Sequence, residues 1–346
     1  MLNLFFMKTR LSLFFVALTT ILSVKAQYTE EINSNRPGVS RGAWSVGKNV
    51  AQIETGPFMV KEKHTPLKNE LSGFGLDFTL RYGLLFEELE LNIEGLYQSA
   101  TFTENRSTVS VEEKFSNFKN LVIGAKYLVY DPYKGKEEDK PDLISYHANR
   151  KFKWKSLIPA VSVYVGANFD SKNNPYLAPE VEGFSPKIII SSQNNFKSGW
   201  VMVVNLIKDR IGTEYSDFQW IVTFTKAINK KWVGFGEAQA IYSDFYADNL
   251  FRFGGAYLQS KDLQFDAGIT FNTKDTPSVF NANFGVSYRF DMHKDPENKD
   301  NGTDVIEEFE RKQNKKGRKN KKKNKSKAKK TSKPKKETQV IDFDSE

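Results

Sequence analysis

The stretch NANFGVSYRF, at residues 281–290, alternates apolar and polar side chains with a period of two. One face carries Ala282, Phe284, Val286, Tyr288 and Phe290, and the residues between them are Asn, Gly, Ser and Arg. This period is that of a β-strand whose two faces lie in different environments. A soluble sandwich would bury the aromatic face. A transmembrane barrel would turn that face to lipid and the polar face to its lumen.

The same alternation recurs along most of the chain and predicts twelve strands. We expect them at about residues 50–62, 71–83, 88–103, 117–130, 156–169, 182–195, 199–209, 217–228, 231–243, 248–260, 262–273 and 279–290. Soluble strands are usually about 5–6 residues long, whereas tilted membrane strands need ~9–11 to cross the hydrocarbon. The predicted strands are of the longer kind. The ninth, WVGFGEAQAIY, is ambiguous because small residues occupy one face.

Three further features favour the membrane barrel. Aromatic residues make up 14% of a chain that has no cysteine, which excludes a disulfide framework. An even number of strands brings both ends of the barrel to the same side, and four of the five connections expected on that side are short. The fold class predicted is therefore all-β: an antiparallel transmembrane β-barrel of about twelve strands, spanning residues 50–290, with a disordered C-terminal tail.

The first 26 residues are predicted to be a secretory signal peptide. Lys8 and Arg10 precede an apolar run from Leu11 to Val24, and Val24-Lys25-Ala26 suits a small-residue cleavage site. The alternative is an N-terminal membrane anchor, but the run is shorter than the ~20 residues that a spanning helix needs.

Several short motifs resemble one family of outer-membrane proteins. ANFGVSYRF looks like the closing strand of outer-membrane barrels, which typically ends in an aromatic residue. NRPGVS (35–40) followed by VAQIETG (50–56) is similar to the entrance of the transporter family of the phenol meta-degradation type. SLIPAVSVYVGANF (156–169) and DAGITFN (266–272) are similar to its middle and penultimate strands. The resemblance covers about residues 33–290 and implies a channel. The tail and an insertion at 131–155 depart from it.

Residues 27–49 are predicted to be a periplasmic or plug segment. Composition and the family resemblance together suggest that Arg36, Pro37 and Gly38 form a turn. We expect this turn to pin the N-terminus near or inside the mouth of the barrel.

The register of the strands assigns a set of polar side chains to the lumen. These candidates are Asp77, Arg81, Glu90, Asn92, Glu94, Lys126, Arg252, Asp266, Asn281, Asn283 and Arg289. They could line an open conduit, or they could pair with one another inside a plugged barrel, because buried charges need partners. Both interpretations remain open at this point.

No enzyme site is predicted. A barrel lipase or acyl transferase needs a nucleophile and a base within hydrogen-bond reach. The three histidines, His64, His147 and His293, are expected in loops or beyond the last strand, with no serine beside them. Without cysteine, they also give no metal-ligand spacing. We expect no metal, no cofactor and no catalytic residue.

The C-terminal residues 291–346 are predicted to be a disordered basic tail in the periplasm. Residues 311–336 hold 16 Lys and Arg and no acid, so the formal charge of +9 belongs to the tail. Nucleic acid is not expected behind a signal peptide. The expected partners are outer-membrane lipid and an anionic periplasmic partner or envelope protein complex, with Phe343 as a candidate docking residue.

The function predicted is an outer-membrane, transporter-like channel for small solutes. The alternative is an accessory structural barrel of a larger envelope complex, recruited through the 131–155 insertion and the basic tail.

Overall fold

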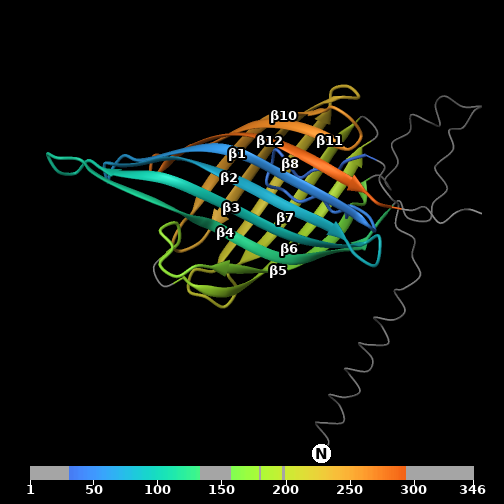
Figure 1. Ribbon diagram of the computed structural model, residues 1–346, viewed down its shortest axis with the longest axis horizontal. Coiled ribbons are helices and arrows are strands. Elements are labelled where there is room, and N and C mark those ends of the chain that lie inside the picture. The colour runs from blue at the N-terminus through green and yellow to red at the C-terminus, as the bar shows by residue number, and fades with distance from the viewer. Residues whose placement is uncertain (1–30, 133–156, 179–180, 197–198, 294–346) are drawn as a thin grey trace, which may run out of the picture. The chain divides into compact units, whose positions relative to one another are not determined.

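The computed structural model describes residues 31–132, 157–178, 181–196 and 199–293. These residues form twelve strands in a closed antiparallel barrel (Figure 1). The strands are β1 (Val50–His64), β2 (Asn69–Gly83), β3 (Leu89–Glu104), β4 (Val111–Tyr130), β5 (Ala160–Asp170), β6 (Gly183–Phe196), β7 (Trp200–Asp209), β8 (Asp217–Ala227), β9 (Trp232–Tyr242), β10 (Asp248–Leu258), β11 (Leu263–Asn272) and β12 (Ser278–Asp291). Among the described residues, no helix is long and apolar enough to span a membrane.

The predicted fold class is confirmed. Each strand pairs with its neighbours in sequence, and β12 pairs with β1 to close the barrel, with Val50 opposite Asp291. Both ends of the strand sequence therefore lie at one end of the barrel, on the right in Figure 1. The predicted signal peptide, most of the 131–155 insertion and the basic tail lie outside the described residues.

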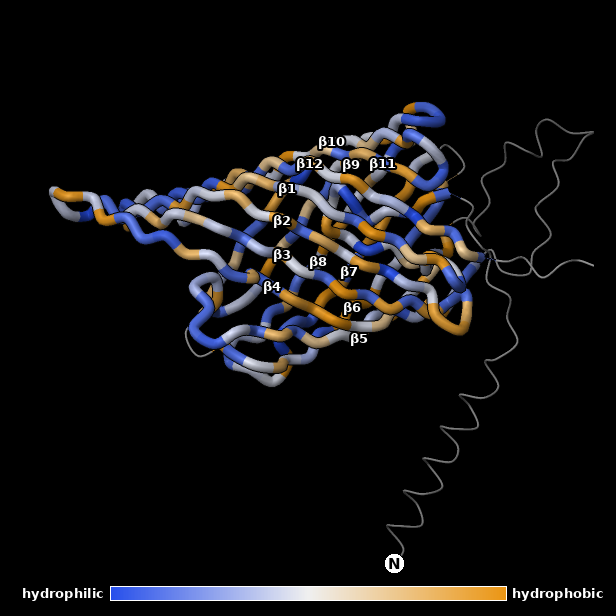
Figure 2. The backbone as a smooth tube through the Cα atoms, viewed as in Figure 1, coloured by the Kyte–Doolittle hydropathy of each residue, from blue (hydrophilic) through white to orange (hydrophobic). Residues whose placement is uncertain are grey.

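The aromatic face of the last strand points outward. Phe284 and Tyr288 are 55% and 42% exposed, whereas Ser287 and Arg289 are buried in the interior. Large apolar side chains are exposed in this way on every strand, and Figure 2 shows hydrophobic and hydrophilic residues alternating along them. Such a surface would be costly in water and is favourable in hydrocarbon. The barrel therefore faces lipid.

The short connections mark the periplasmic end. Four of the five connections at the end where β1 begins and β12 ends are short, namely residues 84–88, 197–199, 228–231 and 259–262, while the fifth, 131–159, is long. Short periplasmic turns and longer outer loops are the rule in bacterial barrels.

The first four strands are the longest, and the hairpin of β3 and β4 extends farthest at the outer end (Figure 1). Our predicted start of the fourth strand, residue 117, is wrong by six residues, because β4 begins at Val111 and pairs with β3 from there. A register shift between Leu96 and Tyr97 interrupts this pairing. The segment 111–116 is rich in charge on both faces, since it lies beyond the lipid, and its alternation is correspondingly weak.

The structure resolves the ambiguous ninth strand. Glu237 and Gln239 of β9 are buried in the interior, and the small residues Gly234, Gly236 and Ala238 alternate with them on the outward face. The register of β9 against β10 places Gly236 opposite Phe253, whose ring lies close to the glycine. The ring of Phe253 thus covers the surface that Gly236 leaves open.

The two faces of β12 give a direct test of the orientation. Phe284→Lys would place an ammonium group among lipid chains, at a cost of about 2–4 kcal/mol near the bilayer midplane. Asn281→Lys, on the same strand, would place the same charge beside the cavity inside the barrel. We expect the first variant to lose most folded, heat-modifiable protein in outer-membrane fractions and the second to retain it. Equal losses would contradict the assigned faces.

Candidate functional site

Residues 31–49 run inside the barrel. Inward-facing side chains of the barrel wall form hydrogen bonds with the backbone of this segment. The backbone N–H groups of the segment donate hydrogen bonds to carboxylates and amides of the wall. The donors and acceptors are Asn35 to Glu54 (3.2 Å), Val39 and Ser40 to Glu237 (3.2 and 3.1 Å), Arg41 to Asn205 (2.6 Å), Ala43 to Gln193 (2.9 Å) and Val46 to Glu90 (2.8 Å). These acceptors belong to β1, β9, β7, β6 and β3, so the segment is anchored to several sides of the wall.

The carbonyl groups of the same segment accept hydrogen bonds from the wall. The wall side chains that donate, each with the residue whose carbonyl accepts, are Arg289 to Glu31 (2.9 Å), Arg81 to Asn33 (2.6 Å), Gln264 to Arg36 (3.3 Å), Asn205 to Arg41 (2.9 Å), and Lys126 to both Gly42 and Trp44 (3.2 and 2.9 Å). Buried backbone groups require partners. In the middle of this segment the partners are mostly side chains of the barrel, whereas at its ends the N–H groups of Ile32 and Asn49 donate to the backbone carbonyls of Lys261 (2.8 Å) and Gly83 (3.0 Å).

A fully buried charge cluster lies at the periplasmic half of the lumen. Arg81 pairs with Glu54 at 3.0 Å and with Glu90 at 2.9 Å, and Lys126 approaches Glu90 at 3.3 Å. Burying such charges is costly unless each has a partner of opposite sign and its remaining hydrogen bonds are satisfied. The backbone of residues 33, 42, 44 and 46 supplies those remaining bonds.

Arg36 lies against the junction where β1 and β12 close the barrel. Its guanidinium pairs with Asp77 of β2 and, at 3.2 Å, with Asp266 of β11, the strands on either side of that junction. Burial alone would lower the pKa of Arg36, but the two carboxylates outweigh it and raise the pKa above its ordinary value. Arg36 therefore bridges four adjacent strands as a cation.

Glycines make room for this side chain. A Cβ atom on Gly285 of β12 would lie 2.2 Å from Nε of Arg36, and one on Gly56 of β1 would lie 2.5 Å from its Nη2. Real side chains do not approach so closely. The closing strands thus form a recess that fits the guanidinium.

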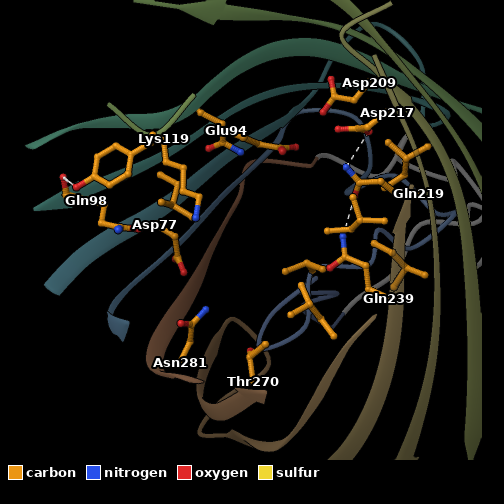
Figure 3. A pocket seen from close by; sticks show the side chains of 18 of the residues that line it. Asp77, Glu94, Gln98, Lys119, Asp209, Asp217, Gln219, Gln239, Thr270 and Asn281 are labelled. Atoms are coloured by element: carbon orange, nitrogen blue, oxygen red, sulfur yellow. Dashed lines mark hydrogen bonds between the residues drawn. The ribbon is translucent and has the colours of Figure 1, made fainter. Parts of the chain in front are cut away.

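The turn at Arg36, Pro37 and Gly38 separates two cavities. The larger cavity, of about 670 Å³, lies on the outer side of the turn, and the smaller cavity, of about 160 Å³, lies on its inner side. All three residues of the turn line both cavities. Figure 3 shows polar side chains that project into the larger cavity from different parts of its wall, among them Asp77, Glu94, Asp217, Gln239 and Asn281. The turn therefore forms part of the wall between the two cavities.

The wall of the larger cavity combines paired charges with apolar side chains. Arg41 pairs with Glu94 and lies 4.1 Å from the ring of Tyr164, and Arg252 pairs with Glu237 at 3.0 Å. Elsewhere Val122, Tyr164, Ile189, Ile207 and Ile221 form a buried apolar cluster inside the barrel. At the outer end, the hydroxyl of Tyr176 donates to the carbonyl of Gln98 at 2.9 Å. Burial raises the pKa of Tyr176 to about 12, so it remains protonated.

The structure brings the predicted lumen candidates together in two groups. Asp77, Glu94, Arg252, Asn281 and Asn283 line the larger cavity. The others are buried around the N-terminal segment and its charge cluster: Arg81, Glu90, Asn92, Lys126, Asp266 and Arg289. Their role in solute passage remains a prediction.

Sequence reasoning missed five wall residues that hold the segment. They are Gln52, Glu54, Gln193, Asn205 and Glu237. All five lie on the polar, inward face of their strands, so the alternation that identified the other candidates could have found them.

The histidines that the structure describes lie outside the lumen. His64 ends β1, and the ring of His293, beyond β12, lies 3.1 Å from the carbonyl of Lys48. His147 lies outside the described residues. Within the described ranges, no group of three or more His, Asp and Glu residues could hold a metal ion.

Comparison with known proteins identifies the family. Residues 34–290 match the model of the family described as "Putative MetA-pathway of phenol degradation". This chain belongs to that family. The match begins at Ser34, within the segment inside the barrel, and ends at Phe290 of β12, which confirms the resemblance drawn from the sequence motifs.

Solved barrels show only a distant similarity. An outer-membrane channel from Pseudomonas putida F1 is 10% identical, with 75% of this chain and 100% of that chain covered and a TM-score of 0.45. The Pseudomonas putida toluene transporter TodX is 9% identical (77% and 95% covered; TM-score 0.42), as is the NanC porin (68% and 98%; 0.45). No curated protein sequence matches the chain. The assignment of this outer-membrane barrel to its family rests on the sequence match.

The recess around Arg36 can be tested by a double-mutant cycle. Arg36→Ala leaves the buried carboxylate of Asp266 unpaired, which should reduce the free energy of unfolding by roughly 3–5 kcal/mol. Gly285→Ala should also destabilise the barrel, because its new Cβ displaces the guanidinium. In the Arg36→Ala background the same Gly285→Ala change should cost little. Additive losses, measured by urea unfolding in detergent, would contradict this contact.

Proposed function

We propose that the barrel is a channel for small uncharged solutes, held closed by the turn at residues 36–38. The observation that carries this proposal is the pair of cavities on the two sides of that turn. A solute that has entered the outer cavity meets Arg36, Pro37 and Gly38 before it can reach the inner one. Passage therefore requires this turn to move while the closed wall stays intact.

The charges around the outer cavity support an uncharged solute. Six acidic and six basic side chains line the cavity, so their formal charges cancel. Several of the basic groups already pair with carboxylates, for example Lys187 with Asp209 at 2.8 Å. A charged solute would have to displace these partners, whereas an uncharged one would not.

The apolar part of the wall supports a solute that is partly apolar. Ile189, Ile207 and Ile221 line the same cavity as the paired charges. The family description refers to phenol degradation. A phenol fits this wall, because it has an apolar ring, one hydroxyl group and, with a pKa near 10, no charge at neutral pH. We therefore take uncharged, singly hydroxylated aromatic compounds as the first solutes to test.

The alternative, an accessory barrel of an envelope complex, depends on the insertion and the basic tail. Both lie largely or wholly outside the described residues, so nothing in the structure favours it.

Planar-bilayer recording of the full chain and of a variant lacking residues 31–47 tests the proposal. We expect low conductance from the full chain and clearly higher conductance from the variant. The deletion also removes Arg36 and Arg41 and leaves the carboxylates of Asp77, Asp266 and Glu94 without these partners, so the open pore should select cations. Heat-dependent gel mobility confirms that the variant is folded.

A second variant, Arg36→Gln, keeps the segment but weakens its attachment and should raise the frequency of openings. A folded deletion variant that conducts no better than the full chain would contradict the proposal. High, steady conductance from the full chain would contradict closure by the turn.

A further inference from the structure

A cluster of lysines lies at the periplasmic end of β8 to β11. Lys226 is the last outward-facing residue of β8. Lys230 and Lys231 lie in the β8–β9 turn, and Lys261 lies in the β10–β11 turn. The turn lysines are exposed, and the two turns contain one acidic residue, Asp262. Lys230 and Lys261 make no ion pair within the described parts of the chain. This corner of the barrel therefore carries a concentrated positive charge.

A backbone hydrogen bond brings the two turns together. The N–H of Leu258, the last residue of β10, donates to the carbonyl of Lys231 at 2.7 Å. Lys261 follows only three residues later, so the lysines of both turns border the same stretch of the rim.

Three aromatic side chains border the lysines on the outward face. Trp200 and Trp232 are 44% and 52% exposed, and the rings of Trp232 and Tyr257 lie 4.8 Å apart. The ammonium group of Lys226 lies 5.3 Å from the ring of Trp200, and that of Lys231 lies 5.8 Å from the ring of Tyr257. Exposed Trp and Tyr gather where a membrane protein meets the headgroups of its lipids. The lysines are therefore at headgroup level.

The opposite side of the same rim has the reverse charge. The β2–β3 turn, residues 84–88, contains Glu87 and Glu88 and no basic residue. Between these two described parts of the rim, the positive charge is thus concentrated on the β8–β11 side.

We propose that the lysine cluster of Lys226, Lys230, Lys231 and Lys261 binds the phosphate groups of anionic phospholipids in the periplasmic leaflet. Basic residues at a membrane surface attract anionic headgroups, and the neighbouring indole and phenol rings hold the lysines at the depth of the phosphates. The site would anchor one side of the barrel in its leaflet, independently of whether the lumen conducts.

Thermal unfolding of the full chain in neutral detergent, with phosphatidylglycerol or phosphatidylcholine added, tests the proposal. The lysine-cluster variant is K226Q/K230Q/K231Q/K261Q. The matched control, K61Q/K63Q/K68Q/K114Q, removes four exposed lysines from the outer end of the barrel. The midpoint temperature of the heat-dependent mobility change is measured for each protein.

We expect phosphatidylglycerol, but not phosphatidylcholine, to raise the midpoint of the native protein and of the control. The lysine-cluster variant should lose most of this rise. In 1 M salt, where the Debye length is about 3 Å, all three proteins should lose it. If the variant fails to fold, K230Q/K261Q replaces it, since both side chains are exposed. Equal retention of the rise, or its equal loss, in the variant and the control would overturn the proposal.

Discussion

The structure depends on hydrogen bonds between side chains of the barrel wall and the backbone of residues 31–49. The lumen of a twelve-stranded barrel is too wide to be filled by the inward-facing side chains alone. It is also too narrow for all of those side chains to be hydrated. Its interior carries buried carboxylates, amides and cations, each of which needs a partner. Glu90, Asn205 and Glu237 find theirs in the N–H groups of the segment. The wall and the segment therefore satisfy each other's buried hydrogen-bonding groups.

This arrangement gives the lumen its division into two cavities. The outward face needs only apolar side chains in contact with lipid, and any register that keeps them outside would satisfy it. The inward face is more demanding, because Arg36 must meet Asp77 and Asp266 while Gly56 and Gly285 leave space for its guanidinium. A turn held in this way lies between the two cavities, and Arg36, Pro37 and Gly38 line both of them.

The sequence predicted the barrel well because a period of two reports directly on which face of a strand meets lipid. Phe284 and Arg289 could be assigned to opposite faces from the alternation alone. It could not show that Glu237 meets the N–H groups of Val39 and Ser40, because that contact joins residues almost 200 positions apart and follows no local pattern. The start of β4 was missed for a different reason: beyond the lipid, neither face of a strand needs to be apolar.

Amide hydrogen exchange of the protein in detergent micelles tests most directly whether the wall holds the segment. The N–H groups of Asn35, Val39, Ser40, Arg41, Ala43 and Val46 should exchange as slowly as those in the middle of β1. The amides of residues 106–110, in the exposed β3–β4 loop, provide the fast reference. Exchange of the segment at the rate of that loop, in a barrel whose strands remain protected, would contradict the account.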